Sequence, residues 1–423
     1  MTTDQAVRST TASPRLQQGL RRNLLNIRLL AFFQVFLVIV PVAVPLFGDR
    51  GLTMAEILQL QAIFGISVVL MEIPSGYVAD VLGRRTALVV GGVFVGIGHS
   101  LLLIGYDFYT LALFELALGV GLSLISGADV AVLYDTQIEL GDDAEARQKG
   151  LGSLFLLRSV SEAAAGITAS VVLLLGTLSE LVWLQVLVGW LPLMFALHVV
   201  EPPVERMPAG AHLGNLTLVL RRILGGEKVL RLTFLAMGIW SLTTYYAVWL
   251  LQQHWLESGV ELTAFGLLWA LFSVAAGLAG WQAANLERRL GAAWLLALVA
   301  TLPVLGYLGL ALAPAGWAMV LGVLFFVARG AGFVLLQEAF NRRLESRYRA
   351  TANSLASFLA RGTVVATVPV VGALLGIWSL REVFAMLALV SLGIALALLL
   401  PLVLAIRQLQ RSPQGSIAGG TVD

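Results

Sequence analysis

The chain has 423 residues, of which 58% are hydrophobic and 12% charged, with a formal net charge of +2 and no cysteine. The apolar residues form repeated runs longer than a globular core helix needs, which indicates a polytopic membrane protein. The lack of cysteine excludes disulfides and iron–sulfur clusters, and the four histidines are not spaced as metal ligands, so we expect no metal site.

The first 22 residues are polar and basic, and the apolar run after them is too long for a signal-peptide core. We therefore expect an uncleaved first transmembrane helix. About 20 apolar residues suffice to cross the hydrocarbon core of a bilayer, and the sequence accommodates twelve such segments. The predicted spans are 24–47, 55–78, 87–106, 109–134, 151–176, 180–200, 231–256, 262–285, 292–312, 316–338, 353–376 and 380–406.

Lysine and arginine predict the orientation of these spans. With the N-terminus in the cytoplasm, only Arg50 and Arg381 of the 27 basic residues fall outside, and Arg158, Arg329 and Arg361 fall within spans. The even number of spans returns the C-terminus to the cytoplasm. We predict a multi-pass protein of a bacterial-type inner (plasma) membrane. Its basic residues serve contact with the lipid bilayer, and no nucleic-acid partner is needed to explain them.

The longest polar stretch, from Glu201 to Arg231, divides the spans into six and six. We predict an N-terminal six-helix bundle at 1–200, a cytoplasmic central linker at 201–230, and a C-terminal six-helix bundle with a short cytoplasmic tail at 231–423. Within the linker, LGNLTLVLRRILG (213–225) has apolar and basic residues at helical spacing. It is either an interfacial amphipathic helix or a plain connector.

The two halves resemble each other in sequence. GYVADVLGRR (76–85) aligns with GWQAANLERR (280–289), and SGADVAVLYD (126–135) with RGAGFVLLQE (329–338). The offsets are 280 − 76 = 204 and 329 − 126 = 203 residues, and the second also aligns Arg158 with Arg361. Matches at nearly one offset indicate an internal duplication, as many transporters have.

The short loop between the second and third spans has the pattern G-x-x-x-D-x-x-G-R-R, formed by Gly76, Asp80, Gly83, Arg84 and Arg85. This pattern resembles the signature loop of the major facilitator superfamily. The resemblance implies an all-α membrane protein with 12 transmembrane helices in two pseudo-symmetric six-helix bundles. It also implies a central cavity whose solute site opens alternately to each side of the membrane.

If the second span stays helical to its end, steps of four and three residues place Glu72, Gly76, Asp80 and Gly83 on one face. The resemblance implies that these residues act in gating. Asp80 would latch the cytoplasmic ends of the two bundles by meeting the start of span eleven, near Asn353.

The resemblance also implies an ion pair between Arg84 and an acid at the cytoplasmic end of span four, for which Asp129 and Asp135 are the candidates. The alternative for Arg84 and Arg85 is simple anchoring at the cytoplasmic side. The second-half copy keeps both arginines but has Ala284 in place of the aspartate. Any latch there should therefore be weaker.

Charged residues within spans cost about 2.5–3.5 kcal/mol on insertion scales and are therefore functional candidates. Asp129 and Arg158 lie at similar depth and are predicted to pair, and Glu162 lies one helical turn beyond Arg158. With Glu115 of span four they are our candidates for proton coupling, because the acids of this group outnumber its base. The alternative is a permanent structural brace between helices.

Two features depart from the pattern of proton-coupled exporters in the superfamily. Many of these exporters have an arginine in the form R-x-x-x-G where this chain has Glu115 before Gly119. Antiporters also have a glycine–proline pattern in span five, whereas EAAAGITAS here has no proline. Their coupling mechanism therefore does not transfer residue by residue, although a membrane glutamate is itself a suitable proton carrier.

The second half offers most candidates for solute binding. Arg329 and Arg361 lie within spans ten and eleven, and an arginine that faces a water-filled cavity suits an anionic or zwitterionic solute. The resemblance places spans one, four, seven and ten around the cavity. The further candidates from spans seven and one are Trp240, Tyr245, Tyr246 and Gln34. The alternative for the aromatic residues of span seven, Trp249 and Trp255 above all, is a position facing lipid.

The chain has no HExxH, G-x-S-x-G or G-x-x-x-x-G-K-[ST] motif, so we expect no catalytic residues, no enzyme activity and no ATP-driven transport. We predict a secondary active transporter that works as a monomer, without a cofactor, on the energy of the proton gradient. Our first expectation is proton-coupled export of an amphipathic or anionic small molecule. The alternative is proton-coupled uptake of a metabolite, and a channel or a non-transporting membrane protein is less favoured.

Overall fold

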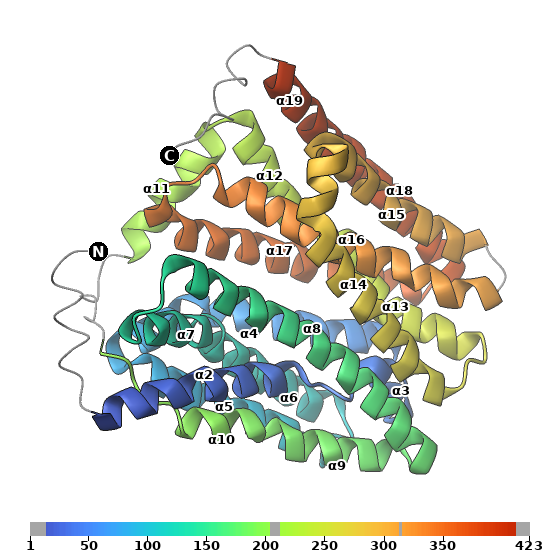
Figure 1. Ribbon diagram of the computed structural model, residues 1–423. Helices are drawn as coiled ribbons and strands as arrows, with labels where there is room; N and C mark the ends of the chain where they lie inside the picture. The colour runs from blue at the N-terminus through green and yellow to red at the C-terminus, as the bar shows by residue number, and fades with distance from the viewer. Residues whose placement is uncertain (1–13, 204–211, 313–314, 412–423) are drawn as a thin grey trace. The chain divides into compact units, whose positions relative to one another are not determined.

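The computed structural model describes residues 14–203, 212–312 and 315–411, and every regular element in these ranges is a helix (Figure 1). Residues 204–211 of the predicted linker and both chain ends lie outside the described ranges. Chain contacts divide the protein into two compact units. Unit 1 comprises Met1–Gly210 and Glu261–Ala270, and unit 2 comprises Ala211–Val260 and Leu271–Asp423.

Unit 1 contains the helices of the first six predicted spans. They are α2 (Pro14–Val35), η1 (Val40–Val42), α3 (Ala43–Asp49), α4 (Met54–Tyr77), η2 (Val78–Leu82), α5 (Arg84–Leu101), α6 (Phe108–Ile125), α7 (Ala128–Glu139), α8 (Ala144–Leu175), α9 (Leu178–Gly189) and α10 (Leu191–Leu197). The first turns of α14 (Leu262–Leu290) also belong to this unit.

Unit 2 contains the rest of α14 and the other helices of the second half. They are α11 (His212–Gly225), α12 (Lys228–Ile239), α13 (Leu242–Glu257), α15 (Ala292–Leu312), α16 (Ala315–Asn341), α17 (Ser346–Leu375), α18 (Leu380–Ile394), η3 (Ala395–Leu399) and α19 (Leu400–Arg411).

Eleven helical segments among the described residues are long and apolar enough to cross a membrane. The third predicted span, α5, is not among them, because Arg84 and Arg85 open the helix and His99 lies near its end. α5 nevertheless packs along α6 and α10 in unit 1. The helical fold therefore agrees with a multi-pass membrane protein of about the predicted number of spans.

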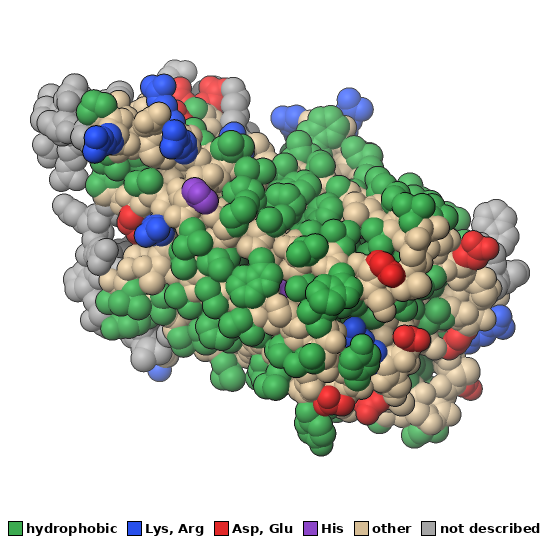
Figure 2. Space-filling model, turned by 90° about the horizontal axis from the view of Figure 1, so that it is seen from below, with side chains coloured by type: hydrophobic (Ala, Val, Ile, Leu, Met, Phe, Trp, Pro, Cys, Tyr) green, Lys and Arg blue, Asp and Glu red, His purple; other side chains and the backbone are tan. Residues whose placement is uncertain are grey.

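The outer surface of the helices is apolar. Tyr109, Leu174 and Leu175 are 79%, 69% and 86% exposed. On the face shown in Figure 2, hydrophobic side chains cover much of the surface and charged side chains lie mostly toward its margins. Such a surface is stable in hydrocarbon, where helices satisfy their own backbone hydrogen bonds.

Local caps start several helices. Thr53, Thr177 and Ser379 each form a capping box with the glutamate three residues later. Asp107 caps α6. Hydrogen bonds from the hydroxyl and backbone N–H of Thr110, and from the backbone N–H of Tyr109, hold the pKa of Asp107 below its ordinary value. These short polar sequences explain why the helices begin where they do.

Several of the predicted spans are interrupted, among them span one between α2 and η1 and span six between α9 and α10. Span four consists of α6 and α7, separated by Ser126 and Gly127, and Gly127 has a φ of +90°. A residue in this left-handed conformation ends the hydrogen-bond ladder of a helix. Span seven consists of α12 and α13, with Trp240 and Ser241 between them. The positions of the spans agree with the prediction, but the sequence did not indicate these breaks, because apolar composition does not reveal a local break.

The helix predicted within the linker is present as α11. Its Val219 and Ile223 are 1% and 0% exposed and belong to a core cluster with Phe340 of α16 and Ala352 of α17. α11 therefore has a buried face in unit 2, and it is more than a plain connector.

Candidate functional site

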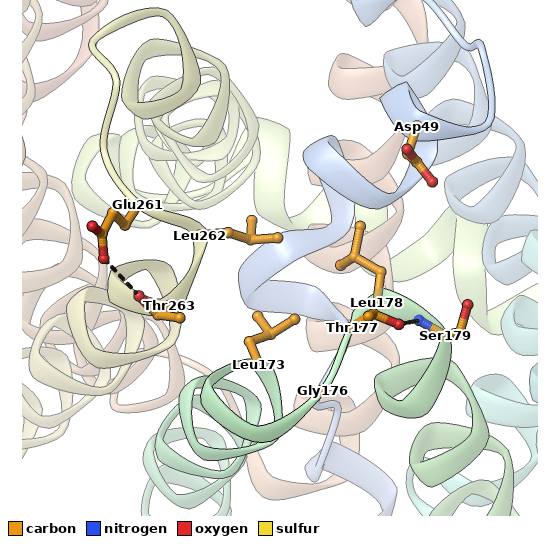
Figure 3. A pocket seen from close by; sticks show the side chains of 9 residues that line it. All are labelled: Asp49, Leu173, Gly176, Thr177, Leu178, Ser179, Glu261, Leu262 and Thr263. Carbon is orange, nitrogen blue, oxygen red and sulfur yellow. Dashed lines mark hydrogen bonds between the residues drawn. The ribbon is translucent and has the colours of Figure 1, made fainter.

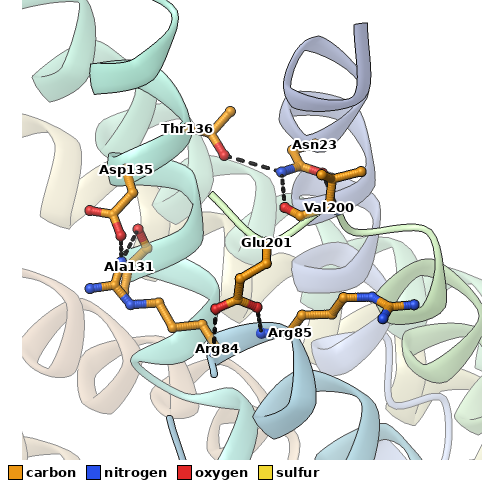
Figure 4. A network of polar contacts seen from close by, with 8 residues as sticks. All are labelled: Asn23, Arg84, Arg85, Ala131, Asp135, Thr136, Val200 and Glu201. Carbon is orange, nitrogen blue, oxygen red and sulfur yellow. Dashed lines mark hydrogen bonds and ion pairs between the residues drawn. The ribbon is translucent and has the colours of Figure 1, made fainter. Parts of the chain in front are cut away.

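The signature motif lies at the junction of α4 and α5, and Figure 4 shows its two arginines, Arg84 and Arg85, with their polar contacts. α4 ends at Tyr77, and the π-helical segment η2 follows. Gly83 then has a φ of +103°, which glycine adopts without strain, and α5 starts directly after it. The common face of residues 72–83 was expected only if the second span stays helical to its end. That condition is not met in the last turn, because a π-helical segment and a left-handed glycine change the register.

Arg84 connects the start of α5 with α7. Its guanidinium forms an ion pair with Asp135, and Nη1 donates a hydrogen bond to the carbonyl O of Ala131 at 3.1 Å. The two side chains are mostly buried, with exposed fractions of 24% for Arg84 and 14% for Asp135. The structure thus selects Asp135 over Asp129 as the partner of Arg84.

Glu201 occupies the N-terminus of α5, and sequence reasoning did not find it. Its Oε1 accepts a hydrogen bond from the backbone N–H of Arg84 at 2.8 Å, and its Oε2 accepts one from Arg85 at 2.7 Å. Gly83 provides no side-chain cap, and a Cβ there would lie 3.1 Å from Glu201 Oε1. A carboxylate at this place suits the positive end of the helix dipole. The available signal was an acid directly after the sixth span.

Asn23 of α2 forms hydrogen bonds to residues next to this junction. Its side chain donates to the carbonyl O of Val200 at 2.7 Å and accepts from the Val200 N–H at 2.9 Å. It also donates to the hydroxyl of Thr136 in α7 at 3.3 Å. Through these contacts α2, α5, α7 and the segment after α10 meet around one set of buried polar groups (Figure 4).

The other gating candidates are less completely described. Glu72 is half-buried in α4, and Gly76 is exposed with open space around it. The side chain of Asp80 lies outside the described residues. Its predicted contact near Asn353 would join the two units, and it stays a proposal.

A second ion pair lies deeper in unit 1. Asp129, which is 0% exposed, pairs with the Arg158 guanidinium of α8. Its Oδ1 accepts a hydrogen bond from the Val130 N–H at 2.7 Å. The predicted pairing of Asp129 with Arg158 is therefore present. Glu162 is half-buried one turn further along α8.

Glu115 lies apart from that pair and has a different partner. Its side chain is 4% exposed in α6, and Oε1 accepts a hydrogen bond from Nε2 of Gln61 in α4 at 2.7 Å. Close packing of α4 on α6 makes this contact possible, since a Cβ on Gly119 would lie 2.5 Å from the Cβ of Ser67. No cation pairs with Glu115 among the residues that the structure describes. Gln61 was missed from the sequence because one glutamine in an apolar helix carries no pattern.

The solute-binding candidates lie in different places. Gln34 is 8% exposed in unit 1. In unit 2, the guanidinium carbon of Arg329 lies 4.6 Å from the ring centroid of Phe326. Arg361 is half-buried in α17.

The aromatic residues of span seven are buried within unit 2. Tyr246, 0% exposed, shares a hydrogen bond of 2.8 Å with Thr367 of α17, and its ring packs edge-on against that of Tyr245. Trp240 fills a space left by Gly332, where a Cβ would lie 2.3 Å from the indole. Trp249 and Trp255 are 8% and 1% exposed, so the alternative that they face lipid is wrong.

Unit 1 has a cavity of about 570 Å³ at the ends of α3 and α8 and the starts of α9 and α14 (Figure 3). Serine and threonine hydroxyls, two carboxylates and leucine side chains line it. The lining residues are Asp49, Leu173, Gly176, Thr177, Leu178, Ser179, Glu261, Leu262 and Thr263. None of the predicted solute-binding residues is among them.

Apolar helices of membrane-spanning length, with ion pairs and a carboxyl group buried between them, are typical of a polytopic membrane protein with a functional site inside the membrane. The family model described as Major Facilitator Superfamily matches residues 24–366. The chain therefore belongs to this superfamily and is a transporter rather than an enzyme. Transporters of this superfamily bind small-molecule substrates and usually work as monomers. No curated protein matches the sequence significantly.

Solved structures of transporters have the same fold. The nucleoside transporter NupG is 16% identical, with a TM-score of 0.71 over 90% of this chain and 98% of its own. A bacterial homolog of the human lysosomal transporter Spinster is 16% identical, with a TM-score of 0.71 over 95% of this chain and 100% of its own. The human organic anion transporter MFSD10 is 15% identical, with a TM-score of 0.58 over 92% of this chain and 100% of its own. These likenesses show the fold alone.

Proposed function

We propose that the protein is a proton-coupled exporter of a small amphipathic or anionic organic solute. The observation that carries this proposal is the buried carboxyl group of Glu115. It lies within a membrane-spanning helix with a neutral amide, Gln61, as its hydrogen-bond partner. A carboxyl group held in this way can bind and release a proton without breaking an ion pair, and intramembrane acids commonly serve proton relays.

The Asp129–Arg158 pair, with Glu162 near it, is the second candidate for coupling. Arg158 neutralises the buried aspartate in the geometry described here. A change of partner during transport would make this pair a proton site, whereas a permanent pair would be a brace. Glu115 is therefore the first residue to test.

The anionic character of the solute is supported by two arginines within membrane-spanning helices, Arg329 of α16 and Arg361 of α17. Guanidinium groups bind carboxylate and phosphate with matched geometry. The structural neighbours include the human organic anion transporter MFSD10 and the nucleoside transporter NupG. Trp240, Tyr245, Tyr246 and Gln34 are the proposed apolar and polar surroundings of the solute.

The proposed cycle is alternating access between two bundles at 1–200 and 231–423, joined by the linker 201–230. Asp80 is the proposed latch between the bundles at their cytoplasmic ends, and the Arg84–Asp135 pair holds the latch loop in place. We propose a monomer in the inner membrane with both termini cytoplasmic. The proton gradient supplies the energy, and no cofactor takes part.

The proposal is tested with the purified protein in proteoliposomes. Protein oriented with its cytoplasmic face outward is given an acidic vesicle interior and a panel of fluorescent organic anions and radiolabelled nucleosides. An exporter accumulates its solute inside with saturable kinetics, and the accumulation collapses when a protonophore removes the gradient. Saturable accumulation only with the opposite gradient identifies the uptake symporter instead, and non-saturable, gradient-independent flux refutes a porter of either kind.

The coupling group is tested with Glu115→Gln against Glu139→Gln, a half-buried acid in α7 outside the proposed sites. We expect Glu115→Gln to lose gradient-driven accumulation while keeping exchange of labelled for unlabelled solute. Glu139→Gln should keep both activities. Full gradient-driven transport by Glu115→Gln would exclude this glutamate as the proton carrier.

A further inference from the structure

A basic and aromatic rim lies in unit 2 where α14 ends and α15 begins, and it includes a residue near the end of α19. α14 finishes with Arg288, Arg289 and Leu290, and Gly291, with a φ of +82°, turns the chain into α15. The first turn of α15 carries Trp294. We call Arg288, Arg289, Trp294 and Arg407 of α19 the rim cluster.

Arg407 reaches the rim cluster from a distant part of the sequence. Its guanidinium carbon lies 4.6 Å from the ring centroid of Trp294, which is a cation–π contact. α19 runs beside α15 in unit 2 (Figure 1), where Leu402 and Val403 share a core cluster with Leu295 and Leu296. The position of Arg407 over the indole is therefore set by packing of the two helices.

The three arginines have no acidic partner among the residues that the structure describes. Arg288 donates a hydrogen bond to the side chain of the neutral residue Asn285. The neighbouring acid, Glu287, lies 3.9 Å from Arg342 on another helix. None of the three positive charges of the rim cluster is therefore neutralised by an ion pair within the described residues.

The apolar members of this rim face outward. Trp294 is 66% exposed, and Leu290 at the end of α14 and Leu409 near the end of α19 are 47% and 42% exposed. Tryptophan is enriched at the boundary between lipid headgroups and hydrocarbon, and basic residues at the ends of membrane helices attract anionic headgroups. A soluble anion would gain nothing from an exposed indole and two exposed leucines, whereas a phospholipid places acyl chains against them.

We propose that the rim cluster is a binding site for the headgroup of an anionic phospholipid, in the leaflet that the sequence predicts to be cytoplasmic. The arginines contact the phosphate, and Trp294 marks the depth of the lipid glycerol region. This inference is independent of the transported solute and of the direction of transport.

The test uses the full chain in nanodiscs of phosphatidylcholine, to which brominated phosphatidylglycerol or brominated phosphatidylcholine is added. Bromine quenches nearby tryptophan fluorescence. We expect brominated phosphatidylglycerol to quench at a lower mole fraction than brominated phosphatidylcholine. Because the chain has ten tryptophans, the signal of the site is the difference in quenching between the unmodified protein and Trp294→Phe. We expect the preference for phosphatidylglycerol in this difference.

The charge requirement is tested with the triple variant Arg288→Gln, Arg289→Gln and Arg407→Gln. The matched control carries Arg15→Gln, Arg21→Gln and Arg22→Gln, which removes three exposed arginines from α2 of unit 1. We expect the mole fraction for half-maximal quenching by the anionic lipid to rise at least about tenfold in the rim variant. The control should be within about twofold of the unmodified protein.

An equal loss of anionic-lipid binding in both triple variants would overturn the proposal, because the general positive charge of the surface would then explain the binding. Displacement of the lipid by millimolar inorganic phosphate would also overturn it, since the site would then be one for a free anion. The thermal unfolding of each variant in detergent without anionic lipid separates a lost site from a misfolded chain. If the rim variant is destabilised in this experiment, Arg407→Lys provides the second test, because it keeps the positive charge. We expect its preference for the anionic lipid to lie between that of the unmodified protein and that of the rim variant.

Discussion

The carboxylate of Glu201 accepts a hydrogen bond from the backbone N–H of Arg84 at 2.8 Å, so a residue directly after the sixth predicted span caps the helix of the third. α5 has no side-chain cap of its own, because Gly83 precedes it. The signature loop is thus held by an acid 117 residues away in sequence. A motif that is contiguous in sequence depends here on a residue outside it.

We predict that Glu201→Ala lowers the free energy of unfolding by about 1 kcal/mol, because it removes a cap and a favourable charge at a helix N-terminus. Glu201→Gln should cost less, since its amide oxygen still accepts one hydrogen bond. Thermal unfolding in detergent measures both. Glu139→Ala is the control for the loss of an acid. If Glu139→Ala lowers the free energy of unfolding by the same amount, Glu201 has no special role as a helix cap.

The Arg84–Asp135 ion pair can be measured with a double-mutant cycle. Arg84→Gln and Asp135→Asn each remove one partner of a mostly buried pair, and the double variant removes both. We expect a coupling energy of about 1–2 kcal/mol in unfolding experiments, since both side chains are partly shielded from water. Purely additive effects would show that the pair contributes no energy of its own.

We expect a larger effect on the free energy of unfolding for the Asp129–Arg158 pair, because the side chain of Asp129 is fully buried. Asp129→Asn leaves a guanidinium without its counter-ion, and we expect it to lower the free energy of unfolding by about 3 kcal/mol. The double variant with Arg158→Gln should recover much of this loss. Gradient-driven transport is then measured for the double variant. If the pair is only a structural brace, this transport should continue, and if the pair is a proton site, it should be lost.

The sequence predicted the helical fold, about the observed number of membrane-spanning segments and the pairing of Arg158 with Asp129. For Arg84 it left two candidates, Asp129 and Asp135, of which the structure selects Asp135. These predictions succeed because hydrocarbon imposes long apolar helices and makes unpaired charge costly. It did not predict the break at Gly127 or the π-helical end of α4. A single glycine is compatible with either a helix or a turn, so only the surrounding packing decides.

The partners of the candidate residues were harder to predict than the residues themselves. Gln61 and Glu201 are single polar residues without a pattern, and their roles arise from helices that meet far along the chain. Trp249 and Trp255 were open to a position facing lipid because tryptophan occurs both at membrane boundaries and in cores. The sequence pattern of a single helix does not predict which of its faces is covered by a neighbouring helix.

The crossing of α8 with the first turn of α14 in unit 1 leads to the last prediction. A Cβ on Gly166 would lie 2.5 Å from the carbonyl O of Gly266, which is a backbone atom that cannot rotate away. Ser170 also donates a hydrogen bond to the carbonyl O of Thr263 at this crossing. Gly166→Ala should therefore separate the two helices and lower the free energy of unfolding by about 1–3 kcal/mol.

Gly152 in the same helix is the matched control, because it is exposed and a Cβ there meets nothing within 4 Å. Gly152→Ala should raise stability by up to about 1 kcal/mol through the better helix propensity of alanine. The opposite signs of the two glycine-to-alanine changes, measured by thermal unfolding of the purified variants, test the close contact directly. If this crossing also closes one side of the transport path, Gly166→Ala should increase labelling of a cysteine introduced at Thr263 relative to Gly152→Ala. Equal labelling in both variants would limit the role of the crossing to stability.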